Sequence, residues 1–73
     1  MARSSKSDLR GQMLEYLLER VQEDAYPSAT MLDAIEAIVR DDEVDEYTSV
    51  LFEKVRGAEY PSMDLIRRLY GFL

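Results

Sequence analysis

The residues whose types and spacing come nearest to chemistry are the carboxylates of one acidic run, Asp41–Glu46. The first, third and fifth residues of this run, all acids, repeat the first three ligand positions of a calcium-binding loop. That loop also needs glycine at its sixth position and glutamate at its twelfth, where this chain has Glu46 and Phe52. We therefore expect no metal site. We interpret the run as the start of a helix, with a solvated face that attracts divalent cations only weakly.

The other residue types that usually carry catalysis are missing or poorly placed. The chain has neither histidine nor cysteine, which removes the commonest general base and the thiol nucleophile. No serine lies in a glycine-flanked nucleophile turn, and no glycine-rich loop is present to cradle a phosphate. We predict that the protein is not an enzyme and has no catalytic residue, cofactor or metal ligand.

A surplus of apolar residues points instead to contact with another protein. A chain of 73 residues builds only a thin core. Several large side chains stand beside the main apolar stripes of the expected helices, and two tyrosines precede prolines. The predicted partner-binding residues are Leu14, Leu18, Val50, Phe52, Tyr26 and Tyr60. The alternative is structural: the four aliphatic and aromatic residues are buried, and each tyrosine packs over the junction between two helices.

Charge divides the chain unevenly. The net charge is −6, but residues 1–10 carry +2 and residues 11–73 carry −8. Because residues 11–73 are this acidic, they repel phosphate, and we expect little direct nucleic-acid binding. We predict a flexible basic arm at residues 1–7 and a single helical domain at residues 8–73. Because no signal-peptide or membrane-spanning pattern is present, we expect a cytoplasmic protein.

An internal repeat organises the sequence. When the chain is shifted by 34 residues, Leu17–Val39 aligns with Leu51–Leu73, with six identities in 23 positions. Three of the identities are contiguous, because Tyr26-Pro27-Ser28 falls on Tyr60-Pro61-Ser62. Apolar character is kept at further pairs such as Leu18/Phe52, Leu32/Ile66 and Ile35/Leu69. Such a period predicts two copies of one supersecondary unit.

Each copy has the pattern of two helices joined by a short turn. In the first copy, apolar spacing predicts one helix from Ser7 or Asp8 to about Asp24. Pro27 ends it, and Ser28 then caps a second helix that runs to Val39 or Arg40. A pairing of Thr30 with Asp33 is an alternative cap for that second helix.

In the second copy, a helix is expected to start at Asp41 or Asp42 and to stop at Gly57 with a positive φ. Ser62 should start the last helix and Gly71 should end it. Phe72 and Leu73 align with core-like residues and are expected to be buried; the alternative is an exposed terminal peptide that enters a receptor pocket. Since nothing alternates like a strand, we predict an all-α, four-helix domain of two related helical hairpins.

Short motifs along the chain carry one family resemblance. They are the two Tyr-Pro-Ser turns, the helix start Asp41-Asp42-Glu43-Val44, and Asp64-Leu65 after the second turn. In these the sequence resembles a group of small uncharacterised helical domains common in actinobacteria. The resemblance implies a bacterial cytosolic protein and brings no assigned function.

Two functions remain open on these observations. The first is a small acidic module that binds another protein, or a second copy of itself, through an apolar helix face. The second is an acidic regulator or inhibitor that mimics nucleic acid on a basic target surface, using Asp41–Glu46 with Glu15, Glu19 and Glu23. Moderate salt weakens contacts dominated by charge and spares apolar ones, so salt dependence separates the two. DNA binding through the basic arm ranks last.

Overall fold

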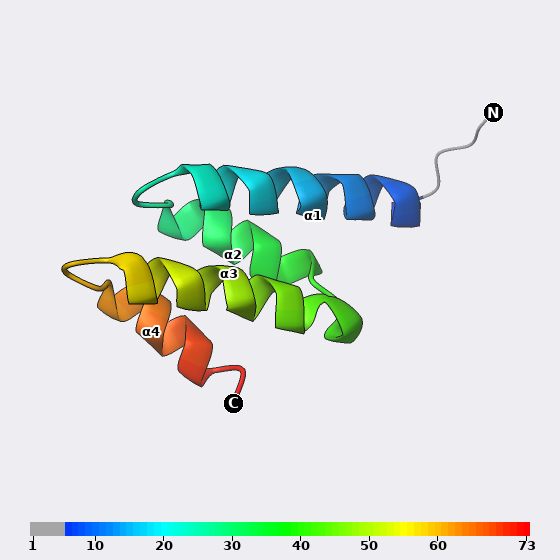
Figure 1. Cartoon of the computed structure of the whole chain (residues 1–73). Helices are drawn as coiled ribbons and strands as arrows, with labels where there is room; N and C mark the ends of the chain where they lie inside the picture. The colour runs from blue at the N-terminus through cyan, green and yellow to red at the C-terminus, as the bar shows by residue number, and fades with distance from the viewer. Residues whose placement is uncertain (1–5) are drawn as a thin grey trace. The chain divides into compact units, whose positions relative to one another are not determined.

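The computed structural model of the chain describes residues 6–73, and within them every regular element is helical (Figure 1). The elements are α1 (Lys6–Glu23), α2 (Ala29–Ile38), the short 3-10 turn η1 (Asp41–Glu43), α3 (Val44–Gly57) and α4 (Met63–Tyr70). The prediction of an all-α protein with four helices is confirmed for this part of the chain. The proposed arm at residues 1–7 lies mostly outside the described residues, and its last two residues belong to α1. No helix among residues 6–73 is long and apolar enough to cross a membrane.

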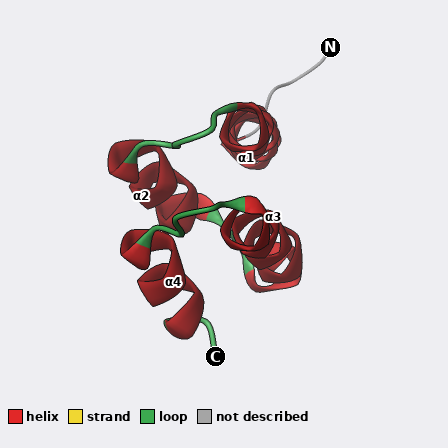
Figure 2. Cartoon of the chain, turned by 60° about the vertical axis from the view of Figure 1, so that its left-hand side comes forward, coloured by secondary structure: helices red, strands yellow, loops and turns green. Residues whose placement is uncertain are grey.

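The contacts of the chain divide it into two compact units, with the boundary between Ile38 and Val39. In unit 1, which ends at Ile38, α1 packs against α2. In unit 2, which comprises Val39–Leu73, α3 packs against α4. A loop without regular structure precedes α2, and another precedes α4 (Figure 2). The fully or nearly buried side chains are Leu14, Leu18, Val21, Leu32 and Ile35 in unit 1, and Tyr47, Leu51 and Leu65 in unit 2.

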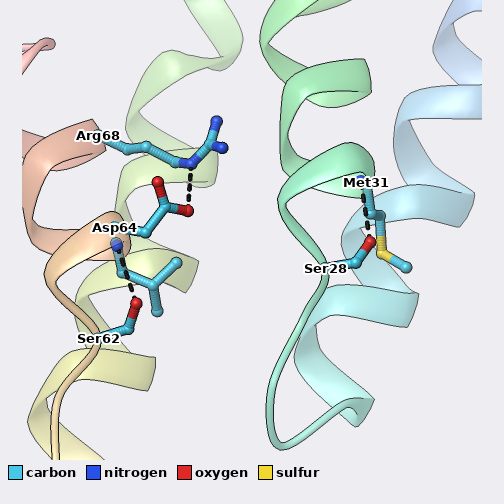
Figure 3. Close-up of polar contacts among 6 residues, drawn as sticks. Ser28, Met31, Ser62, Asp64 and Arg68 are labelled. Carbon is cyan, nitrogen blue, oxygen red and sulfur yellow. Dashed lines mark hydrogen bonds and ion pairs between the residues drawn. The ribbon is translucent and has the colours of Figure 1, made fainter.

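Serine hydroxyls start both α2 and α4, as the sequence predicted. The Oγ of Ser28 accepts a hydrogen bond from the backbone N–H of Met31 at 3.1 Å. The Oγ of Ser62 accepts one from the N–H of Leu65 at 3.3 Å (Figure 3). Each bond satisfies one of the N–H groups that a helix start leaves unpaired. The alternative cap at Thr30 is wrong, because α2 already begins at Ala29.

The start of α3 differs from the prediction by one short turn. Residues 41–43 form the 3-10 turn η1, and the α-helix begins only at Val44. The capping acid is Glu43, whose Oε1 accepts a hydrogen bond from the N–H of Arg40 at 2.9 Å. Neither Asp41 nor Asp42 is the first residue of an α-helix. The tighter turn lets Glu43 reach back three residues, which is the geometry of a capping box.

The carboxyl end of α2 is held by a cation from α1. The Nη1 of Arg10 donates a hydrogen bond to the carbonyl oxygen of Ile38, the last residue of α2, at 2.9 Å. Helix carbonyls at this end have no partner in the helix and carry partial negative charge. Arg10 therefore links the two helices of unit 1 through an interaction that suits both the donor and the helix end.

The end of α3 shows that the expected left-handed glycine is wrong. Gly57 is the last residue of α3, and no residue in the described part of the chain has a positive φ. The chain leaves the helix through Ala58, with φ −88° and ψ 137°, whose N–H bonds to the carbonyl of Val55. Lys54 and Arg56 lie in the last turn of α3, where cations suit the helix end.

The C-terminal residues are less buried than the sequence predicted. The ring of Phe72 packs edge-to-face against buried Tyr47 and is itself half-buried. Leu73 is 99% exposed, so the expectation that it is buried is wrong. The repeat aligns it with Val39, which is half-buried just before η1.

Candidate functional site

Unit 2 contains an open groove of about 530 Å³ between α3 and α4. Phe72, beyond the end of α4, also lines it. We call this surface the α3–α4 groove. Its apolar lining includes Val44, Phe52, Val55, Ile66, Leu69 and Phe72.

Helical spacing explains why these side chains meet. On α3, Thr48, Phe52 and Val55 are separated by four and three residues, so they share one face of the helix. Ile66 and Leu69 have the same relation on α4. The buried residues Leu51 and Leu65 lie one helical turn before the lining residues Val55 and Leu69, so the buried layer adjoins the groove. The groove is thus supported by a packed layer and does not depend on a flexible loop.

The polar groups of the groove are few. Asp45 and Ser49, from the first turns of α3, line it and are exposed. Thr48 also lines it, but its hydroxyl is already bonded to the carbonyl oxygens of Val44 and Asp45, at 2.9 and 3.2 Å. Such a lining suits apolar side chains, with one acidic residue to fix the orientation of what binds.

The aromatic ring of Phe52 marks the edge of the groove. The guanidinium carbon of Arg56 lies 5.8 Å from the centroid of this ring, within the range of a cation–π contact. The same guanidinium bonds the Oε2 of Glu53 at 3.4 Å. An exposed aromatic ring held by a neighbouring cation is pre-ordered for contact, which lowers the entropy lost on binding.

The acidic run does not form a metal centre in this structure. Asp41, Asp42, Asp45 and Glu46 are all exposed. No group of three or more acidic side chains within the described residues is placed to hold a metal ion. The side chains of Glu15, Glu19 and Glu23 are also exposed, and they belong to unit 1.

No protein-family model, curated protein or solved structure matches this chain. The resemblance to actinobacterial helical domains therefore stays a prediction. What the groove binds has to be argued from its own residues.

The structure separates the six predicted contact residues. Leu14 and Leu18 are buried in unit 1, and Val50 is half-buried on α3. Tyr26 and Tyr60 are 89% and 84% exposed in the loops, so the interpretation that they pack over the helix junctions is wrong. Of the six, Phe52 is the one that lines the α3–α4 groove.

The sequence did not single out the other groove residues. Val55, Ile66 and Leu69 were recognised as apolar residues of their helices, and Phe72 was expected to be buried because it aligns with Ile38 in the repeat. Apolar residues at helical spacing are the sequence signal for them, and this spacing does not distinguish a buried residue from one that lines an open groove. Three of the four aligned residues in unit 1 are fully buried, whereas the groove residues that align with them border open space.

Proposed function

We propose that this chain is a non-enzymatic protein-interaction module whose α3–α4 groove receives apolar side chains of a partner protein. The observation that carries the proposal is the groove itself, with the ring of Phe52 52% exposed at its edge. Large apolar side chains left open to water forgo about 25 cal/mol for each Å² of apolar surface not buried. A partner that covers the groove recovers this free energy.

The composition of the groove favours this function over acidic mimicry. Aromatic side chains in an apolar patch are enriched among the residues that dominate the free energy of protein association. The acids that mimicry would use, such as Asp41 and Glu19, are exposed but belong to two different units. Each set alone is a short cluster on one helix start or one helix face. The apolar groove is the larger feature organised for binding.

We further propose that the two units are related helical hairpins, as the 34-residue repeat predicts. The capping bonds of Ser28 and Ser62 support this relation, because aligned serines start aligned helices with bonds of 3.1 and 3.3 Å. The packing of α1 on α2 and of α3 on α4 also supports it. On this proposal the module is one structural unit used twice, with different surfaces exposed.

The test compares capture of partners by three forms of the chain from a lysate of its native host. Phe52→Glu places a carboxylate in the groove, and Ala58→Glu places the same group on the exposed segment between α3 and α4. We expect one protein to be retained by the wild-type chain and by Ala58→Glu, and to be lost from Phe52→Glu. The loss should be similar at low and moderate salt, since apolar contacts are not screened.

Two outcomes contradict the proposal. A partner retained equally by Phe52→Glu does not use the groove. A partner released from the wild-type chain by moderate salt alone binds through charge, which favours the acidic regulator instead. Far-ultraviolet circular dichroism of each variant checks that the helices remain intact.

A further inference from the structure

The repeated Tyr-Pro-Ser block forms the centre of two matching loops. Residues 24–28 join α1 to α2, and residues 58–62 join α3 to α4, so the two loops have the same length and lie 34 positions apart. We call them the Tyr-Pro loops. The residues that line the α3–α4 groove all lie outside these loops. The Tyr-Pro loops are therefore a feature that the proposed function leaves unused.

Two of the three residues in each block have a structural role. The serine hydroxyl caps the next helix, through a hydrogen bond of 3.1 Å at Ser28 and of 3.3 Å at Ser62. The proline keeps the residue before it out of the helical conformation, so the preceding helix does not continue into the block. Neither role needs an aromatic side chain at the first position of the block. The tyrosine therefore requires a different explanation.

The two tyrosines of the blocks are open to water. Among the described residues, Tyr26 and Tyr60 have the most exposed aromatic side chains, at 89% and 84%. The aromatic pair and the cation–π contact found in residues 6–73 involve other rings. One exposed aromatic ring is ordinary on a protein surface. Here the same ring is exposed at the same position of both copies, beside two residues that keep their structural roles, and this recurrence indicates contact with another molecule.

The backbone of the block is extended. Ser62 has φ −77° and ψ 128°, close to the values of a polyproline II helix, which are about −75° and 145°. The ring of Pro61 fixes its φ at about −65°, and the residue before a proline, here Tyr60, favours extended backbone. Ser28 caps α2 by the same bond that Ser62 makes to α4. Each block is thus held between two helices, which lowers the entropy lost on binding.

We propose that the two Tyr-Pro loops bind a partner protein that has an aromatic-lined groove of the kind that accepts polyproline II segments. Such grooves pack proline against aromatic rings and gain from a backbone that is already extended before binding. The adjacent tyrosine adds a large ring to the buried surface, and its hydroxyl finds a polar partner at the rim. The block supplies what this class of groove recognises, because proline and an exposed ring are adjacent on extended backbone.

The two loops make each chain a ligand with two equivalent contacts. One Tyr-Pro loop buries little surface, so a single contact is weak. One chain binds two grooves of the partner, and a second contact within the same assembly raises the apparent affinity. Loss of either tyrosine should therefore weaken the binding, and loss of both should abolish it.

The experiment introduces the photo-reactive residue p-benzoylphenylalanine beside each tyrosine of the full chain, in place of Ala25 or of the aligned Glu59. Both positions are exposed, so circular dichroism should show intact helices. Irradiation in a lysate of the native host should give an adduct with the same protein from both positions. The same photo-reactive residue in place of Glu19, an exposed residue of α1, should not give this adduct.

Competition with unlabelled chains tests whether the tyrosines make the contact. Excess wild-type chain should suppress both adducts, and Tyr26→Ala or Tyr60→Ala should do so less strongly. The chain with both tyrosine substitutions should not suppress them. A chain with Glu19→Ala and Glu53→Ala is the matched control, because it changes another exposed identity of the repeat, and it should compete like the wild type.

Three results overturn the inference. They are different adducts or none from the two positions, full competition by the chain that lacks both tyrosines, and a captured protein without an aromatic-lined groove. The proposed function fails separately, because Phe52→Glu keeps both loops and should compete fully. If Phe52→Glu fails to compete while the chain without both tyrosines competes, the captured protein binds the α3–α4 groove and only the inference fails. If the adducts form as expected but Phe52→Glu loses no host protein, only the proposed function fails.

Discussion

The ring of Phe72 meets the ring of Tyr47 edge-on, with 5.8 Å between their centroids and 79° between their planes. This geometry is favourable for aromatic pairs, because the positive edge of one ring faces the negative face of the other. Tyr47 is fully buried on α3, whereas Phe72 follows α4 and lines the α3–α4 groove. One contact therefore ties the end of the chain to the core and shapes the candidate site.

Phe72→Ala should lower the free energy of unfolding by about 1–3 kcal/mol, since Phe72 is only half-buried. Urea unfolding followed by circular dichroism measures the change. Phe72→Leu keeps apolar volume but loses the ring pair, so it should cost less. An unfolding free energy unchanged in Phe72→Ala would mean that the end of the chain contributes nothing to the fold.

Substitution by aspartate should have different effects at the aligned positions Leu18 and Phe52. It should unfold the chain at Leu18 and leave it folded at Phe52. Leu18 is 4% exposed, so Leu18→Asp buries an unpaired carboxylate at a cost of about 4 kcal/mol or more. A chain of this length is stable by only about 4–11 kcal/mol. We expect Leu18→Asp to lose most of its helical circular-dichroism signal.

Phe52→Asp is the matched half of that comparison. Phe52 already contacts water, so the variant should stay folded and lose only its binding surface. Equal loss of helix in both variants would show that the groove is a closed core in solution.

The two capping serines, Ser28 and Ser62, should contribute similarly to the free energy of unfolding. Ser28→Ala and Ser62→Ala should each lower the free energy of unfolding by about 1 kcal/mol, because each leaves one backbone N–H unpaired. Aspartate is an equally good cap, so Ser28→Asp and Ser62→Asp should restore stability. Thermal and urea unfolding check both. Failure of aspartate to restore it would mean that the serines act through packing.

The ion pair between Arg68 and Asp64 on α4 should contribute more to the free energy of unfolding than the pair between Arg56 and Glu53 on α3. The Nε of Arg68 lies 2.9 Å from the Oδ2 of Asp64, and the Arg68 side chain is mostly buried (Figure 3). Asp64→Ala should therefore cost about 1 kcal/mol of unfolding free energy.

Glu53→Ala is the matched control for Asp64→Ala. It breaks the pair of Arg56 and Glu53, which is 3.4 Å long and exposed on both sides, and should cost close to nothing. A larger loss from Glu53→Ala in urea unfolding would contradict this ranking.

Local chemistry made much of the helix layout predictable. Pro27 and Pro61 stop helices for steric reasons, and the serines after them offer hydroxyls to the next N–H groups. These effects act within four residues, so the sequence shows them directly. The start of α3 was placed too early because a 3-10 turn and an α-helix make similar use of acids at their first residues.

Exposure was harder to predict because it depends on residues distant in the sequence. Leu18 and Phe52 are aligned and similarly apolar, yet one is buried and the other half-exposed. Tyr26 and Tyr60 have an apolar ring and a polar hydroxyl, so either environment suits them and local pattern does not choose. The groove was missed because local pattern does not show which apolar residues are exposed, although its apolar lining residues were all recognised as apolar.

The ordinary backbone of this chain has a consequence for how its stability can change. No described residue needs a left-handed conformation, and a methyl group added at Gly11 or Gly57 would meet nothing within 4 Å. Gly11 lies inside α1, where alanine is favoured over glycine by about 1 kcal/mol. Replacing Gly11 by alanine should therefore raise the free energy of unfolding without changing the groove. Natural variation or protein engineering can use that gain in stability to tolerate substitutions that change the shape of the proposed binding groove.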